Sequence, residues 1–443
     1  MINLKLAEKI FISILAFSIL LSAFGKGFID NEYLSSLLVV SISCVMVFFI
    51  IPLVIKNNIA KFLIFIFFCI RLVLLYLDYY GKDLATILHS GGDSERFYEW
   101  GLYISKDFSR MEEISYTIYT DFLGVLYWVI GDQRFFSQFL NVILGMWSIF
   151  VFFKILDLFK LKDSKKFFFL VLYGLYPQNI IFSSILLREA IIQFLFIYSI
   201  LFFTKWLMKN NRVDLYKTLF FVLLSSVFHS GMLFSLFVYG FIFLFLDLKK
   251  YKLNFSFKRK TLFVFCCGIA VILIAYNMSF LNSKFSFLLP DSNSSFIEKY
   301  DARVGVELGG ASYLIDYKIN SVVDLITLAP LKLFYFIFSP MPYDVRGGSD
   351  LVAIIFDSSF YYFLFFSVLR GRKKIKGSVF RIFPNVFFTL FLIMALVFAL
   401  GTENSGTAMR HRSKILPTLL LALVFIDTIK QNRLYIWNDK KND

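Results

Sequence analysis

Long apolar runs recur along almost the whole chain, and no other feature constrains its fold as strongly. The 443 residues are 58% hydrophobic and include 59 Phe, more than one water-soluble core can bury. A helix of about 20 apolar residues can span a bilayer, because it satisfies its own backbone hydrogen bonds where water is absent. None of the runs alternates like a barrel strand. The strongest runs are 9–24, 34–55, 62–79, 136–156, 167–184, 190–206, 217–229, 232–246, 261–277, 351–368, 383–400 and 414–428.

These runs predict an all-α, polytopic membrane protein with about twelve transmembrane helices, forming a single integral-membrane domain over residues 1–443. The first run has the length of a signal peptide, but no small-residue cleavage site follows it, so we expect a retained helix. All the cysteines lie inside apolar runs, without the spacing of a disulfide framework or a zinc site, and we expect them to serve in packing. They are Cys44, Cys69, Cys266 and Cys267.

Charge predicts the orientation of the helices, because short loops rich in Lys and Arg stay in the cytoplasm. With twelve spans and both termini cytoplasmic, every strongly basic loop falls on the cytoplasmic side. Two weaker apolar stretches lie at 116–131 and 321–338. If both crossed the membrane, the first three basic loops would be placed outside the cytoplasm, so we expect both stretches to be interfacial or re-entrant elements. The basic loops lie around 160–166, 205–217, 249–260 and 370–381.

The net charge of +15 follows from this orientation signal and from attraction to anionic membrane lipids. Nucleic-acid binding is not needed to explain it. On the opposite side, the prediction leaves two long segments, 80–135 and 278–350, and long loops of mixed composition usually carry function. All three histidines fall on this side, with other ionisable residues whose cost at membrane depth marks a substrate path. The set comprises His89, Asp93, Glu95, Arg96, Arg188, Glu189, His229, Arg303, Arg346, Glu403, Arg410, His411 and Arg412.

The stretch HSGGDSERFYEWG, residues 89–101, opens an amphipathic helix whose apolar residues recur at three- and four-residue steps. Asp93 or Ser94 can cap this helix, and Glu95 lies in its first turn, where the helix dipole favours anions. Asp93 is then either a cap or a general base that activates a sugar hydroxyl, and Glu95 is a second candidate for a catalytic carboxylate. A divalent cation held by Asp93 and Glu95 is a weaker alternative, because residues two apart on a helix point in different directions. No other metal or cofactor is predicted.

Arg188 and Glu189 follow a YPQN turn at 176–179, and either pair with each other or serve a ligand. In the second case Arg188, Arg410 and Arg412 would clamp phosphate oxygens with their planar guanidinium groups, beside His411. His229 is a helix-break cap or a catalytic imidazole. The remaining candidates for a phosphate or sugar contact are Arg303 and Arg346. Arg71, inside the third run, is expected to pair with Asp78 or with a neighbouring helix.

Three motifs, DSERFYEWG, the YP…LLRE pair of 176–189 and GTAMRHR near the C-terminus, resemble the membrane polymerases of bacterial O-antigen and capsule loci, the Wzy type. More broadly they are similar to the GT-C glycosyltransferases. The resemblance implies a multi-pass protein of the bacterial inner membrane that joins undecaprenyl-diphosphate-linked oligosaccharides on the periplasmic face. The expected partners are this lipid-linked substrate, membrane lipids and a chain-length regulator. It implies a catalytic carboxylate at Asp93 and diphosphate-binding arginines at Arg188, Arg410 and Arg412. A DxD motif is absent, since 93–95 reads DSE.

Two other functions remain open. A GT-C transferase would add single sugars from a polyprenyl-phosphate donor, and a lipid-linked oligosaccharide flippase would also have about twelve spans. A flippase should show related halves and polar residues along the midplane, whereas this chain has no internal repeat and its charge lies at one face. The nucleotide-binding motif GxxxxGK[ST] and the protease motifs HExxH and GxSxG are absent.

Overall fold

The structure is a computed structural model. It describes residues 4–27, 30–83, 87, 89–111, 117–256, 262, 311–314, 317 and 321–431. The predicted span 261–277 apart from residue 262, Arg303 and most of the segment 278–350 lie outside the described residues. Contacts group the chain into two compact units. Unit 1 comprises Met1–Trp206 and Asn211–Ser230, and unit 2 comprises Leu207–Asn210 and Gly231–Asp443.

The all-α class is confirmed, and the apolar helices fit a membrane-embedded protein. Within the described ranges, seven helices are long and apolar enough to cross a membrane, so the twelve predicted spans are not confirmed. The seven are Leu4–Gly25, Asn31–Val54, Asn58–Tyr80, Arg134–Leu158, Glu189–Lys209, Gly348–Lys374 and Val379–Leu400. The runs at 217–229, 232–246 and 414–428 form helices that are shorter or carry more charge.

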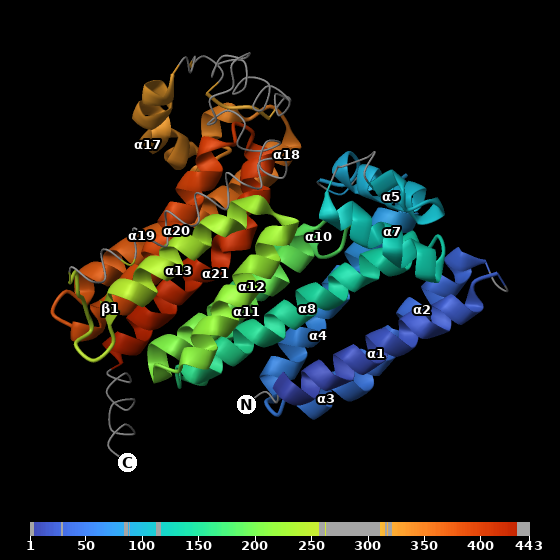
Figure 1. Cartoon of the computed structure of the whole chain (residues 1–443), viewed down its shortest axis with the longest axis horizontal. Helices are drawn as coiled ribbons and strands as arrows, with labels where there is room; N and C mark the ends of the chain where they lie inside the picture. Colours follow the sequence, from blue (N-terminus) through green and yellow to red (C-terminus); the bar gives the residue numbers. More distant parts are fainter. Residues whose placement is uncertain are drawn as a thin grey trace. The chain divides into compact units, whose positions relative to one another are not determined.

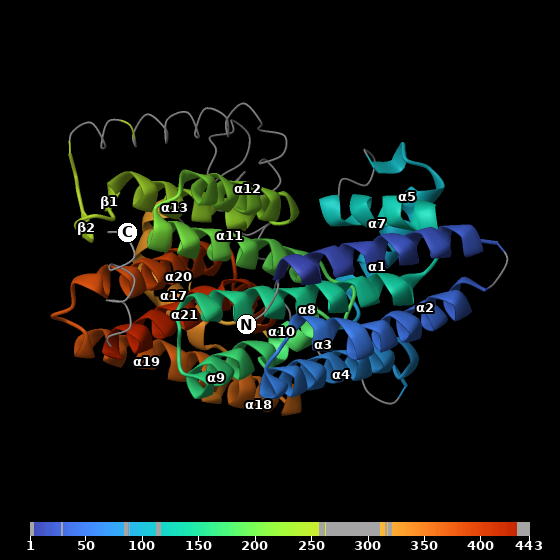
Figure 2. The ribbon, with the colours of Figure 1, turned by 90° about the horizontal axis from the view of Figure 1, so that it is seen from below.

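Unit 1 is a bundle whose successive long helices run in alternate directions (Figures 1 and 2). The C-terminal ends of α1, α4 and α12 therefore share one end of the bundle with the N-terminal ends of α2, α8 and α11. Two shorter helices, α5 and α7, lie at this end, which we call the α5 end. The helices are α1 (Leu4–Gly25), α2 (Asn31–Val45), α3 (Ile51–Val54), α4 (Asn58–Tyr80), α5 (Asp93–Lys106), α7 (Ile118–Ile130), α8 (Arg134–Leu158), α9 (Asp163–Gly174), α10 (Pro177–Phe182), α11 (Glu189–Lys209) and α12 (Arg212–Phe228).

The predicted span 167–184 is broken into α9 and α10, because Pro177 starts a new helix and cannot donate a backbone hydrogen bond to the preceding one. Arg71 of α4, fully buried, donates to the Gly174 carbonyl at the end of α9 and to the Ser183 hydroxyl after α10. Asp78 instead accepts from Gln138 of α8 at 2.6 Å. Arg71 thus bonds to backbone and hydroxyl oxygens at the break between α9 and α10, which confirms the expected contact with a neighbouring helix and not the alternative pair with Asp78.

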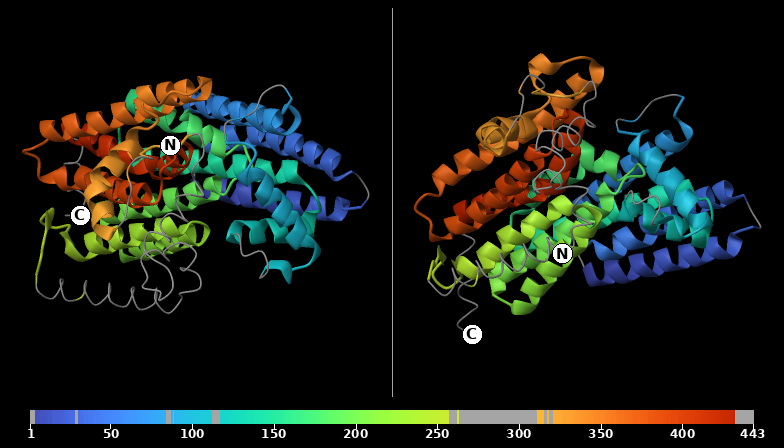
Figure 3. Two further views of the ribbon diagram at one scale, coloured as in Figure 1. Left: turned by 90° about the horizontal axis from the view of Figure 1, so that it is seen from above. Right: turned by 45° about the horizontal axis from the view of Figure 1, so that its top comes forward.

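Unit 2 is organised around α21, whose side chains are buried along most of its length. The helices α19, α20 and α21 lie side by side, and α17 packs against α20 (Figure 3). A short antiparallel hairpin pairs Leu246 with Leu253. The elements are 3-10 helix η2 (Ser230–Leu233), α13 (Phe234–Phe245), β1 (Leu246–Asp247), β2 (Lys252–Leu253), α17 (Val322–Phe338), α18 (Gly348–Ala353), α19 (Ser359–Lys374), α20 (Ile382–Leu400) and α21 (Ser405–Lys430).

The two weaker apolar stretches form α7, of 13 residues, and α17, of 17 residues. Both are shorter than the helices counted above as long enough to cross a membrane. Asp121 lies in the first turn of α7, and α17 contains Pro330. Their interfacial placement stays a prediction.

Candidate functional site

The amphipathic helix predicted after the Gly-Gly pair is present as α5. Phe97, Gly101 and Ile104 are buried, whereas Trp100 and Tyr103 are 37% and 41% exposed. Gly91 and Gly92 have positive φ, and Gly92 occupies the N-cap without any side-chain cap hydrogen bond. The expectation that Asp93 or Ser94 caps the helix is therefore wrong. Asp93 is the first helical residue, partly buried, and it does not serve as the cap.

Glu95 is held by two cations at the start of α5. Arg134, the first residue of α8, donates from both terminal guanidinium nitrogens to the two carboxylate oxygens, and Lys82 donates at 2.9 Å. The hydrogen bonds from Arg134, aided by Lys82, lower the pKa of Glu95 from 4.5 to about 2, although burial opposes the shift. Glu95 is thus ionised at neutral pH and fixes α5 onto α8. A metal ion shared with Asp93 would compete with Arg134 and Lys82 for it.

Tyr98, in the next turn of α5, is also held by residues near the start of α8. The Tyr98 hydroxyl donates to both oxygens of Asp132, at 2.9 and 3.1 Å, and its ring lies 5.0 Å from the Arg134 guanidinium carbon. Burial, with the hydrogen bond to Asp132, raises the pKa of Tyr98 to about 12. These contacts hold the N-terminal half of α5, and with it Asp93, in one position.

Arg188 and His89 approach α5 from two different segments. The Arg188 guanidinium lies 5.9 Å from the centre of the Phe97 ring, and Phe97 is one helical turn after Asp93 on the same face of α5. The His89 ring lies 5.2 Å from the ring of Phe182, at the end of α10. The structure therefore brings both residues to the end of α5 that begins with Asp93.

The segment that carries Arg188 is anchored from α8. The side-chain amide of Asn141 donates to the carbonyls of Ile185 and Leu187, at 2.8 and 2.9 Å. The same nitrogen reaches the Tyr119 hydroxyl at 3.4 Å, and the Tyr119 ring meets Phe97 edge to face at 5.1 Å. Asn141 was not predicted from the sequence, since an Asn inside an apolar run gives no sign of the backbone it binds.

His229 lies at the C-cap of α12 and is buried. One turn earlier, the Ser225 hydroxyl donates to the Ile192 carbonyl of α11 at 3.4 Å. Because α11 and α12 run in opposite directions, His229 is at the level of Arg188 and Glu189, where α11 begins. Unit 1 thus places these predicted residues at its α5 end, together with Glu95 and Arg96 of α5, and we call five of them the α5 cluster. They are His89, Asp93, Arg188, Glu189 and His229.

The candidates in unit 2 are engaged within that unit. Arg412 is fully buried and donates to the carbonyls of Ile337 and Ser339, at 2.7 and 2.6 Å, and to the Asp357 carboxylate. Its predicted role at a diphosphate stays a prediction, but its contacts are those of a residue that ties α21 to α17 and to the π-helical turn before α19.

Arg410 and His411 are only partly buried. The His411 ring stacks on Phe398, with centres 4.6 Å apart, and its Nδ1 is 3.0 Å from the ammonium of Lys414. Arg346 forms an ion pair with Asp350, one turn away, at 2.9 Å. The expectation that Arg410 and Arg412 join Arg188 in one clamp stays a prediction, because Arg188 belongs to the other unit.

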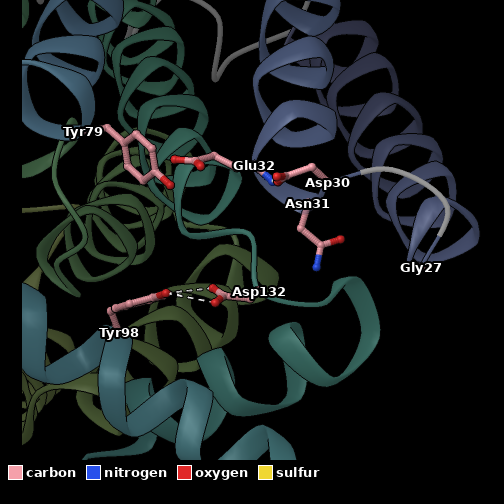
Figure 4. Close-up of a pocket in the computed structure, with 7 residues that line it drawn as sticks. All are labelled: Gly27, Asp30, Asn31, Glu32, Tyr79, Tyr98 and Asp132. Atoms are coloured by element: carbon pink, nitrogen blue, oxygen red, sulfur yellow. Dashed lines mark hydrogen bonds between the residues drawn. The ribbon is translucent and has the colours of Figure 1, made fainter.

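Two features were missed by sequence reasoning. One is the buried ion pair of Lys332 and Glu403 in unit 2. The other is a hollow of about 690 Å³ in unit 1, lined by residues from four separate segments (Figure 4). Its members lie far apart in the sequence, and no pattern predicts that they meet. They are Gly27, Asp30, Asn31, Glu32, Tyr79, Tyr98 and Asp132.

No protein-family model, curated protein or solved structure matches the chain.

Proposed function

We propose that the chain is a membrane glycosyltransferase that joins undecaprenyl-diphosphate-linked oligosaccharide repeat units into O-antigen or capsular polysaccharide, as Wzy-type polymerases do. The observation that carries the proposal is the α5 cluster. A carboxylate that does not cap its helix, a guanidinium and two imidazoles gather at one end of an apolar bundle. Acid–base groups beside an anion-binding guanidinium, next to apolar helices, suit a substrate with a diphosphate and a long lipid.

Asp93 is assigned as the general base. The hydroxyl of the acceptor sugar attacks the anomeric carbon of the donor, its proton passes to Asp93, and the bond between that carbon and the diphosphate oxygen breaks. Arg188 stabilises the negative charge on the departing diphosphate. Asp93 suits this role because it starts α5, one helical turn before Phe97, whose ring lies 5.9 Å from the Arg188 guanidinium.

Glu95 is assigned a positioning role. A general base must exchange protons near the working pH, and a carboxylate whose pKa is held near 2 by Arg134 and Lys82 does so poorly. His89 and His229 flank the site, and His229 is assigned to accept or relay the same proton.

The charge at the two ends of unit 1 supports an extracytoplasmic position for the α5 cluster. The turns at the opposite end of the bundle carry a dense set of lysines and arginines, as cytoplasmic loops do. This set comprises Lys56, Lys61, Lys160, Lys162, Lys165, Lys166, Lys205, Arg212 and Lys217. The proposed location is the periplasmic face of the bacterial inner membrane, with both termini in the cytoplasm.

A transferase that adds one sugar would use the same cluster, so product length separates it from a polymerase. A flippase is less well supported. A flippase would be indicated by charged residues at membrane depth along the substrate path. Arg71 of α4 is such a residue, but its guanidinium donates hydrogen bonds to oxygens at the break between α9 and α10.

The test uses the purified full-length chain in proteoliposomes. The substrate is lipid-linked oligosaccharide extracted from cells that lack this protein. Wild-type protein should give a ladder of extended lipid-linked products on a gel. Asp93→Asn should lower the rate by about 100-fold or more, because a general base contributes on that order. The matched control is Asp107→Asn, an exposed acid after the same helix, which should keep the wild-type rate.

Each other outcome has a defined meaning. Full-length products from Asp93→Asn would remove this residue from the mechanism. A single added sugar would replace the polymerase with a single-sugar transferase. Transfer of unextended substrate between leaflets, without any new glycosidic bond, would establish the flippase.

A further inference from the structure

The hollow at the α5 end of unit 1 is distinct from the α5 cluster. Its walls come from the turn between α1 and α2, the C-terminal end of α4, the middle of α5 and the turn between α7 and α8 (Figure 4). Its volume, about 690 Å³, is in the range of sites that hold small ligands.

Its lining chemistry is one-sided. Asp30, Glu32 and Asp132 supply carboxylates, Asn31 an amide, and Tyr79 and Tyr98 two phenol rings, whereas the described lining contains no Lys or Arg. The nearby cations are used elsewhere. Arg134 binds Glu95, and Lys26 donates to the Trp128 carbonyl at 2.8 Å. Ionised carboxylates only accept hydrogen bonds, so the hollow calls for a ligand rich in donors.

The phenol hydroxyls of the hollow meet only part of this need. The Tyr98 hydroxyl already donates to Asp132, and the Tyr79 hydroxyl points toward the Glu32 carboxylate (Figure 4). Asp30 accepts from the backbone of Glu32, which accounts for one of its oxygens as the cap of α2. Several carboxylate lone pairs therefore remain for a donor from outside.

Asn31 gives an observation independent of the carboxylates. Its amide oxygen is shielded from solvent and accepts no hydrogen bond within the described part of the chain. The amide packs against Gly131, where φ is +82° and an added Cβ would lie 2.7 Å from the Asn31 nitrogen. A glycine is thus required for this wall to close. A buried acceptor without a donor is costly, and a hydroxyl from a bound molecule would satisfy it after a small rotation of the amide.

We propose that this hollow binds a hydroxyl-rich sugar unit without acidic groups, at the acceptor end of the glycan. Sugar hydroxyls donate to the carboxylates and to Asn31, and the rings of Tyr79 and Tyr98 offer apolar faces to the sugar ring. Three carboxylates repel uronic acids and the diphosphate, so the hollow distinguishes the acceptor sugar from the donor's leaving group.

The identity of the ligand as the acceptor rests on the proposed function, because it takes Asp93 as the base. Both sites share α5. Tyr98 follows Asp93 by five residues, or about 8 Å along the helix axis. The contacts of Glu95 and Tyr98 with the start of α8 fix that separation.

The test measures binding of the oligosaccharide repeat unit, released from its lipid by mild acid, to the full-length chain in nanodiscs. Tyr98→Phe keeps the ring and removes the hydroxyl, and Asp132→Asn removes a charge. Each should weaken binding at least tenfold by calorimetry. Glu99→Gln, an exposed acid on the same helix outside the lining, should bind within twofold of wild type.

Unchanged affinity in both lining variants would overturn the proposal, and so would tight binding of spermidine that depends on Asp132, because the hollow would then be a site for cations. The proposed function fails separately. Saccharide binding that depends on the lining, from a chain that forms no glycosidic bond, would keep the hollow and reject the polymerase. Polymerisation by a chain whose lining variants bind the saccharide as wild type does would keep the polymerase and reject the hollow as the binding site. A chain that neither binds the saccharide nor polymerises would reject both proposals.

Discussion

Asp93 and Glu95 are separated by one residue, yet their surroundings give them different chemistry. Glu95 is bound by Arg134 and Lys82, 39 and 13 residues away in the chain, whereas Asp93 starts α5 without capping it. The sequence identifies both carboxylates as candidates, because a Gly-Gly turn before an amphipathic helix is a local pattern. It cannot rank them, since the cations that hold Glu95 come from other segments.

Glu95→Gln should lower the stability of the protein at pH 7 by about 2 kcal/mol, because Arg134 loses a charged hydrogen-bond partner. The folded-state pKa of Glu95 is depressed to about 2, so its contribution is fully present above the unfolded value of 4.5 and is lost as the pH falls toward 2. Melting temperatures in detergent should therefore differ between wild type and variant from pH 7 to 5 and converge as the pH falls from 4.5 toward 2.

The control for this comparison is Glu99→Gln, an exposed acid one turn further along α5. Its melting temperature should follow wild type over the whole range. A difference between Glu95→Gln and wild type that grows below pH 4 would contradict the assignment of Glu95 as an ionised structural residue.

At the scale of elements, α5 and α7 form the platform for the site, and small residues let them approach closely. A Cβ at Gly101 would lie 2.8 Å from Leu123 of α7, and a Cβ at Gly124 would collide with Ile104 of α5. The two glycines therefore sit at reciprocal positions of one helix contact, and the position of Asp93 depends on them.

Gly124→Ala should force α5 and α7 apart, destabilise the protein by about 1–3 kcal/mol and reduce transfer activity in the same sample. The matched control is Gly240→Ala, in α13, where an added Cβ meets nothing within 4 Å. That change should leave the melting temperature equal or higher, since Ala favours helix. Equal effects of the two substitutions would show that the contact between α5 and α7 is not tight.

The elements also show where sequence reasoning succeeds and where it ends. Apolar runs and their periodicity predict the long helices and α5, because a helix in lipid satisfies its own backbone and a surface helix buries one face. The same reasoning merged α9 and α10 into one span. The apolar sequence continues through Pro177, although the helix is interrupted there. The carbonyl of Gly174 at the interruption accepts a hydrogen bond from Arg71, a residue of α4.

For the molecule as a whole, the separation of charge along unit 1 links fold to function. Sidedness, read from basic loops, predicted that His89, Asp93, Arg188 and His229 share one end, and unit 1 places them together there. The hollow beside them was not predicted, because its carboxylates come from turns whose meeting depends on helix packing. The proposed reaction depends on the α5 end facing the side on which lipid-linked glycans are extended.

Cysteine labelling of intact cells tests this dependence most directly. In a chain with its four cysteines replaced by Ala, Glu99→Cys marks the α5 end and Lys162→Cys the opposite end of unit 1, and both positions are exposed. A membrane-impermeant maleimide should label position 99 in intact cells, and position 162 only after the membrane is opened. Labelling of position 162 alone in intact cells would place the α5 cluster in the cytoplasm and contradict the account.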